Sequence, residues 1–96
     1  MNIASTNAYN GWSNYETWNV KLWIDNDEYL YNQFLDEAKQ LKGLSNAEIK
    51  LADSLKQCFD DNMPELEGCY ADLLNASLSE VDWYEIAESI LEEIDE

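Results

Sequence analysis

The stretch SNYETWNVKLWIDN, residues 13–26, decides the fold class because it joins a helix-start signal to an apolar face at helical spacing. Ser13 is followed three positions later by a glutamate, the arrangement of a capping box, in which the two side chains satisfy the first free N–H groups of a helix. Tyr15, Trp18 and Leu22 then recur at three- and four-residue steps, and Val20, Trp23 and Ile24 join them in a broad apolar face. The stretch predicts a first helix that begins at Ser13 and ends near residue 26.

Four further helices are predicted from similar start and stop signals along the rest of the chain. Gly and Pro occur only near the predicted helix ends, and no run of alternating β-branched residues lies between hairpin turns. We expect the second helix to be capped by Asn26 or Asp27, to bury a stripe of Leu30, Phe34, Ala38 and Leu41, and to stop at Gly43. The third should open with a capping box at Ser45, carry Leu51, Leu55, Cys58 and Phe59 on its inner side, and stop near Asn62. The fourth should begin with Pro64 and bury Leu66, Tyr70, Leu73 and Leu74. The fifth should be capped by Ser79 and run from Glu80 to Asp95.

The length and composition limit the chain to one small folded domain. Its 96 residues suffice for a single modest core, and 46% of them are hydrophobic, which is too high for a disordered acidic chain. We therefore predict an all-α protein, a small single-domain bundle of about five helices over residues 13–96, preceded by a flexible N-terminal arm over residues 1–12.

The charge balance indicates the kind of partner. The chain has 21 acidic residues, five lysines and no histidine, and its formal net charge is −16. Such a chain repels phosphate groups, so we expect no direct binding to nucleic acid and none to an anionic membrane. The expected partner is a basic protein surface.

The residue types that enzymes use most are missing. Without histidine there can be no histidine-based triad, general base or metal ligand, and neither Cys58 nor Cys69 has a neighbouring residue that would activate a thiol. We expect no enzyme activity, no cofactor, and no catalytic or metal site. A carboxylate enzyme using Mg²⁺ remains an alternative, because Asp60 with Asp61, or Asp25 with Asp27, could bind a hard cation.

The two cysteines and the N-terminus bear on the compartment. Cys58 and Cys69 do not form a C-x-x-C pair and are expected to be buried or half-buried free thiols, with a disulfide as the alternative. The first nine residues have neither the basic start nor the apolar stretch of a signal peptide, and no apolar run is long enough to span a membrane. The expected location is the cytoplasm.

Most of the negative charge lies in the second half of the chain. Residues 1–43 carry six acids and three lysines, whereas residues 44–96 carry fifteen acids and two lysines. On the last helix Glu85, Glu88 and Glu92, continued by Glu96, follow one stripe. We expect these acids to form a partner-binding face that imitates a polyanion, although a solvated face that only keeps the protein soluble remains the alternative. The candidate acids are Asp60, Asp61, Glu65, Glu67, Glu85, Glu88 and Glu92.

A second hypothesis places binding on the aromatic residues near the N-terminus. Trp12, Tyr15, Trp18 and Trp23 lie within twelve residues of one another. We expect Trp18 to belong to the core, and leave Trp12 and Trp23 open as members of an exposed aromatic face. A small adaptor or regulatory module could use that face to bind a partner helix or a second copy in a homodimer.

The segments GWSNYETWNV (residues 11–20), LWIDNDE (22–28), DLLNA (72–76) and SEVDWYEIAE (79–88) resemble a family of small uncharacterised acidic proteins carried by bacteriophages, plasmids and bacterial genomes. The resemblance covers nearly the whole chain and implies no activity and no catalytic residues. Its setting on mobile elements implies defence or counter-defence roles. By analogy with acidic proteins that imitate DNA, we expect an inhibitor of a host defence nucleoprotein, of the anti-CRISPR or anti-restriction type.

Overall fold

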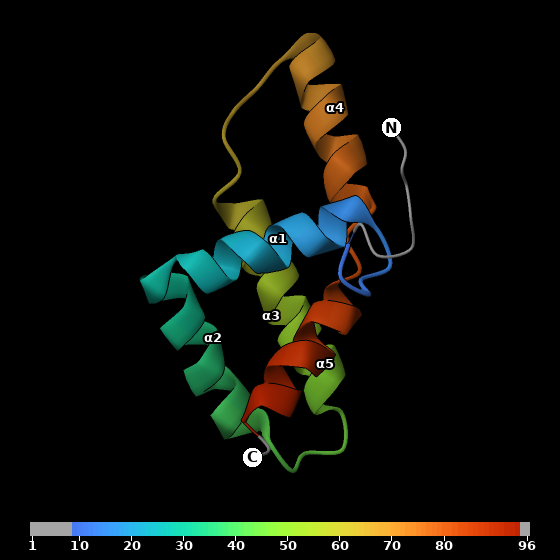
Figure 1. Ribbon diagram of the computed structural model, residues 1–96. Helices are drawn as coiled ribbons and strands as arrows, with labels where there is room; N and C mark the ends of the chain where they lie inside the picture. The colour runs from blue at the N-terminus through green and yellow to red at the C-terminus, as the bar shows by residue number, and fades with distance from the viewer. Residues whose placement is uncertain (1–8, 95–96) are drawn as a thin grey trace.

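The computed structural model describes residues 9–94 and has five helices within that range (Figure 1). The prediction of an all-α bundle of about five helices in a single small domain is confirmed. The helices are α1 (Tyr15–Asn26), α2 (Glu28–Leu41), α3 (Ala47–Asp61), α4 (Gly68–Ser79) and α5 (Trp83–Glu93).

The hydrophobic core lies between α3 and α5, which pack most extensively, and is closed by α1 and α2 (Figure 1). Helix α2 contributes Phe34 and Ala38, which have no exposed surface, and Gly43 with φ +93° ends the helix as predicted. The predicted inner side of α3 is also confirmed in part, since Leu51 and Leu55 are fully buried while Cys58 and Phe59 are half-buried.

Helix α1 buries only part of the predicted apolar face: Val20 and Ile24 are buried as expected, whereas Trp23 is 65% exposed. Its buried residues are Thr17, Val20, Lys21 and Ile24, whereas Tyr15 and Leu22 are exposed and Trp18 is half-buried. The prediction that Trp18 belongs to the core is wrong; its ring contacts that of Tyr15, with 5.5 Å between ring centroids and an angle of 45° between the ring planes. The prediction considered only apolar side chains, but two of the inward positions are polar. Thr17 and Lys21 each bond to a residue on another element.

The helix-start predictions are wrong by one to four residues at four of the five helices. Asn14, not Ser13, caps α1 by accepting the N–H of Thr17 at 2.9 Å. Helix α3 starts after Asn46 rather than Ser45, and α5 is capped by Asp82 rather than Ser79, which is the last residue of α4. Only α2 begins as expected, where Asp27 accepts the N–H of Leu30 at 3.1 Å. In each of the three helices whose N-cap side chain accepts a backbone N–H, that side chain is a short Asn or Asp.

Helix α4 differs most from its prediction. It begins at Gly68 rather than at Pro64, because residues 63–67 form a connection without helical structure, Glu67 is extended, and Gly68 adopts a φ of +62°. Of its own described residues none is buried, and α4 has no extended packing with α1, α2, α3 or α5. The predicted burial of its apolar residues is wrong for Tyr70 and Leu73, which are 72% and 60% exposed. In Figure 1, α4 stands away from the body at the top of the view.

The start of α1 is hydrogen-bonded to the connection between α4 and α5. The side-chain amide of Asn14 donates to the carbonyl of Glu80 at 2.7 Å, and the fully buried hydroxyl of Thr17 accepts the N–H of Asp82 at 2.9 Å. The N–H of Ser13 donates to the carboxylate of Glu85 at 3.2 Å. The polar residues of the SNYET segment therefore hold the two ends of the domain together.

Replacing Thr17 with valine should lower the free energy of unfolding by about 1–3 kcal/mol, because the shape is kept while the buried N–H of Asp82 loses its acceptor. Urea unfolding followed by circular dichroism measures the change. Thr17→Ser is the matched control, since it keeps the hydroxyl and loses only one methyl group. Equal losses in both variants would show that packing, and not this hydrogen bond, sets the contribution of Thr17.

Of the predicted N-terminal arm, residues 1–8 lie outside the described part of the chain. Residues 9–12 form a turn in which the N–H of Trp12 donates to the carbonyl of Tyr9 at 2.9 Å. The indole of Trp12 is half-buried and packs against the core. Within the described residues, no helix has both the length and the apolar character needed to cross a bilayer.

Candidate protein-binding surfaces

The acids predicted on the last helix lie together on α5, beside Trp12. Glu88 and Glu92 are exposed, and Glu85 is half-buried and accepts the N–H of Ser13. Glu96, the predicted continuation of the row, lies outside the described residues. The α5 acidic row, defined as Glu85, Glu88 and Glu92, borders a shallow hollow of about 260 Å³. The hollow is lined by Asn10, Gly11, Trp12, Glu85, Glu88, Ser89 and Glu92.

The other four candidate acids lie at the far end of α3 and in the connection to α4. Asp60 is paired with Lys56 at 3.1 Å, and Asp61 accepts a hydrogen bond from the side chain of Gln57 at 2.8 Å. Glu65 and Glu67 are exposed at the edge of a larger hollow of about 460 Å³. That hollow lies between residues 63–67 and α4 and is otherwise lined by Met63, Pro64, Leu66, Ala71, Leu74 and Asn75.

The seven candidate acids thus fall into two groups. The hollow beside the α5 acidic row and the hollow at residues 63–67 share no lining residue. The first group borders an aromatic residue of the N-terminal turn, whereas Glu65 and Glu67 border aliphatic side chains. The two groups of acids have different neighbours and form two separate surfaces.

The aromatic residues of the second hypothesis are also spread out. Trp23 is 65% exposed near the end of α1, while Trp12 is half-buried ahead of the same helix. Tyr15, 51% exposed, contacts Tyr9 and Trp18, with ring centroids 6.2 and 5.5 Å away. Trp12 therefore belongs with the α5 acidic row, and Trp23 stands apart from it.

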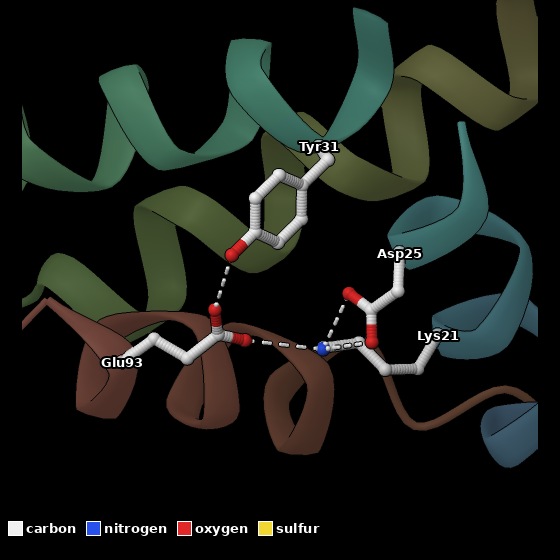
Figure 2. Close-up of polar contacts among 4 residues, drawn as sticks. All are labelled: Lys21, Asp25, Tyr31 and Glu93. Carbon is white, nitrogen blue, oxygen red and sulfur yellow. Dashed lines mark hydrogen bonds and ion pairs between the residues drawn. The ribbon is translucent and has the colours of Figure 1, made fainter. Parts of the chain in front are cut away.

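A buried lysine forms a polar network that the sequence analysis did not anticipate (Figure 2). The ammonium of Lys21 lies 2.8 Å from both carboxylate oxygens of Asp25 and 3.2 Å from Glu93, and its side chain is only 7% exposed. The hydroxyl of Tyr31 donates to the other oxygen of Glu93 at 3.1 Å. The network ties α1, α2 and α5 together. Lys21 and Asp25 are four residues apart, which is the only signal in the sequence that could have indicated it.

The same network partly neutralises the acids at the C-terminal end of α5. These acids lie at the negative end of the helix dipole, and the helix itself carries no lysine that could offset their charge. The structure supplies two from other helices: Lys21 pairs with Glu93, and Lys42 donates to the carbonyl of Ile94 at 3.2 Å. Glu93 therefore has a structural role, and it does not belong to the α5 acidic row.

The hydrogen bond to Glu93, together with the charge of that carboxylate, raises the pKa of Tyr31 above its ordinary value of 10.0. A raised pKa in the folded state contributes stability below the unfolded pKa, and this contribution is lost as the pH rises through the folded pKa. Burial and the nearby Glu48 and Glu88 carboxylates raise the pKa of Tyr84 in the same direction.

We therefore expect the protein to lose stability as the pH rises above about 10, and Tyr31→Phe to lose less than the wild type over that range. Urea-unfolding midpoints measured at a series of pH values between about 8 and 12 test this. Tyr84 contributes to the loss of stability in both proteins. The stability of Tyr31→Phe should therefore still fall with rising pH, but less steeply than that of the wild type. Parallel curves for the two proteins would contradict the role given to the Tyr31–Glu93 hydrogen bond.

The carboxylate pairs considered for a hard cation have other partners. Asp25 pairs with Lys21, Asp27 caps α2, and Asp60 and Asp61 bond to side chains one turn earlier on α3. No group of three or more potential ligands for a metal ion occurs in residues 9–94. Both cysteines are free thiols; Cys58 is half-buried as expected, but Cys69 is exposed, because α4 does not pack on the core.

Together the fold and the surfaces define a small acidic all-α protein with two separate candidate binding surfaces. The chain belongs to a family of unknown function, DUF7249, whose family model matches residues 5–96. The expected membership of an uncharacterised family is thereby confirmed. No curated protein and no solved structure matches the chain.

Proposed function

We propose that the protein is a non-enzymatic inhibitor, encoded by a phage or another mobile element, that acts in the host cytoplasm. It would occupy the basic nucleic-acid groove of a host defence protein, of the anti-CRISPR or anti-restriction type, by imitating DNA. The observation that carries the proposal is the α5 acidic row, which sets three carboxylates along one helix beside Trp12 in a chain of net charge −16.

The spacing of the row suits a groove that binds a polyanion. Steps of three and four residues correspond to a rise of about 4.5 to 6 Å along the axis of α5, against a rise of about 3.4 Å along the DNA axis between phosphates on one strand. A basic groove built for phosphates would thus meet a row of charges with a somewhat wider axial spacing. Long lysine and arginine side chains can adjust to that difference.

The row is also held in place by its neighbours. Helix α5 packs along α3 and buries Ile86, Ala87 and Ile90 on the opposite side of the helix. Glu85 is fixed further by the N–H of Ser13. Because the helix that carries these carboxylates is folded before the partner arrives, binding would lose little backbone entropy.

The test compares two variants that remove the same charge from different places. Glu85→Gln with Glu88→Gln and Glu92→Gln neutralises the row, and Glu28→Gln with Asp36→Asn and Asp53→Asn neutralises three exposed acids elsewhere. Each protein is immobilised and exposed to a nuclease-treated lysate of the cell from which the gene comes. The captured protein is then purified, and displacement of labelled DNA from it is measured by fluorescence anisotropy.

We expect the wild type to displace DNA, the row variant to do so at least about tenfold less well, and the control variant to match the wild type. Displacement should fall steeply with salt and be lost near 1 M, where the Debye length is only about 3 Å. Equal losses in the two variants would mean that total charge matters and the row does not. A partner that stays bound at that salt concentration, or one that does not bind DNA, would contradict the proposal.

A second candidate function rests on the exposure of Trp23. An adaptor that binds its partner through the exposed aromatic face would lose binding when Trp23 is replaced by alanine, whereas the polyanion mimic would not. Trp12→Ala does not separate the two functions, because Trp12 borders the α5 acidic row. Capture that depends on Trp23 and is indifferent to the row would favour the adaptor.

A further inference from the structure

Helix α4 is amphipathic, yet its apolar side faces solvent. Tyr70 and Leu73 lie three residues apart on one side and are 72% and 60% exposed, and Leu66 of the preceding connection is 44% exposed. Leu74 and Ala71 are half-buried and form one wall of the hollow beside residues 63–67. Exposed apolar side chains that gather on one surface usually mark a site of interaction.

The helix also has little to hold it in place. Its N-cap residue, Glu67, makes no side-chain capping bond, its first residue is a glycine at φ +62°, and α4 contributes no buried side chain. A helix of twelve residues is marginal by itself in water. An occupant that covers Tyr70 and Leu73 would therefore stabilise α4 as well as bind it.

The charges around α4 indicate which occupant fits. The helix itself carries only one charged side chain, Asp72, so its apolar side can approach another apolar surface. Glu65 and Glu67 stand at the edge of the adjoining hollow, and Glu80 follows the end of the helix. Apolar residues bordered by carboxylates match a segment with leucine-like residues on one face and lysine or arginine on its flanks.

A second copy of this chain matches the surface less well. In a two-fold interface between α4 helices, the acidic residues around one α4 would lie near those around the other, in molecules that each carry a net charge of −16. Like charges brought together in this way oppose association. A neutral apolar partner would leave the bordering carboxylates without counterions. Charge complementarity thus favours a cationic occupant.

We propose that α4 and residues 63–67 form a docking surface for a cationic amphipathic helix of a partner protein. The proposal deepens the proposed function, because a basic partner would present such a helix next to its nucleic-acid groove. The α4 docking surface is defined by Leu66, Tyr70, Leu73 and Leu74, with Glu65 and Glu67 at its edge. It shares no residue with the α5 acidic row, so the two surfaces can be tested separately.

The probe is a synthetic helical peptide of about 18 residues, in which leucines at the first and fourth heptad positions form a stripe and lysines fill most other positions. A second peptide has the same composition in scrambled order, so its charge is equal but its apolar stripe is lost. Binding to the intact protein is measured by fluorescence anisotropy. Backbone amide resonances of α4 report where the peptide binds.

Two variants of the protein test whether the peptide binds at the α4 docking surface or elsewhere on the protein. Tyr70→Ser with Leu73→Ser removes the apolar side of α4, and Tyr29→Ser with Ile49→Ser removes one aromatic and one aliphatic residue of comparable exposure elsewhere. Because all four side chains are exposed, both variants should fold, which their circular dichroism spectra and unfolding midpoints check. Glu65→Gln with Glu67→Gln tests the carboxylates at the edge.

We expect the amphipathic peptide to bind the wild type and the control variant equally, and the α4 variant at least about tenfold more weakly. The scrambled peptide should bind the wild type at least about tenfold more weakly, and the edge variant should show a weaker dependence on salt. The row variant at Glu85, Glu88 and Glu92 should bind the peptide as the wild type does. A failure of the row variant to displace DNA would then bear on the proposed function alone, and not on the α4 docking surface.

Three results would overturn the proposal. Equal binding of the two peptides would mean that charge alone attracts them, and equal binding by the α4 variant and the wild type would place the peptide elsewhere. Sedimentation velocity showing a dimer that forms at raised concentration, and that the α4 variant abolishes, would make a second copy the occupant.

Discussion

Leu51→Ala is expected to lower the free energy of unfolding by about 3–4 kcal/mol, the range for a fully buried leucine in a core that relaxes little. Leu51 lies on α3, whose packing against α5 is the largest contact in the domain. A domain of this size has a total stability of about 5–14 kcal/mol, so the variant would lose a large share of it. Urea unfolding followed by circular dichroism measures the loss.

The matched control is the same substitution on α4. Leu73 is 60% exposed, so Leu73→Ala removes hardly any buried surface and should change the free energy of unfolding by less than about 0.5 kcal/mol. Similar losses at both positions would show that α4 packs against the body in solution. That outcome would also remove the basis for the α4 docking surface.

Lys21→Ala is expected to lower the free energy of unfolding by about 2–3 kcal/mol. Breaking a buried ion pair usually costs more, about 3–5 kcal/mol, but here the two carboxylates, Asp25 and Glu93, are 41% and 35% exposed and can be hydrated once the lysine is gone. The aliphatic part of Lys21 also loses its packing. In a domain of this size the unfolding temperature should fall by roughly 10–20 °C.

Lys56→Ala provides the comparison, because it breaks an ion pair between neighbouring turns of one helix at the surface. Lys56 and Asp60 are 58% and 44% exposed, and such a pair contributes about 0.3–0.5 kcal/mol. Combining Lys21→Met with Asp25→Asn and Glu93→Gln should recover much of the stability, since no unpaired charge is then left. Equal effects of Lys21→Ala and Lys56→Ala would mean that the network contributes no more than a surface pair.

The fold class and the central parts of four helices could be predicted from apolar spacing, but details that depend on long-range partners could not. The pattern placed Leu51, Leu55 and Phe34 inside, and the structure buries all three. It did not place Thr17 and Lys21 inside, because each of these buried polar side chains bonds to a residue more than sixty positions away in the chain, Asp82 and Glu93 respectively. Local sequence carries no signal for such a partner.

The candidate surfaces, like the helices, could be predicted only in part from the sequence. The stripe of Glu85, Glu88 and Glu92 follows from helix geometry, but its position beside Trp12 depends on how the N-terminal turn packs. The exposure of Tyr70 and Leu73 was missed, because helical spacing is the same whether an apolar face meets the core or a partner. Their pattern in the sequence indicated a buried face.

The hydrogen bonds from Asn14 and Thr17 to residues 80 and 82 also bear on how the chain acquires its structure during synthesis. They span 66 and 65 positions, so they can form only after the ribosome has released most of the chain. Until then the hydroxyl of Thr17 and the side of α3 that packs against α5 lack their partners. A message cut short before codon 80 would therefore yield a product exposed to proteolysis, and native packing would arise in one late cooperative step.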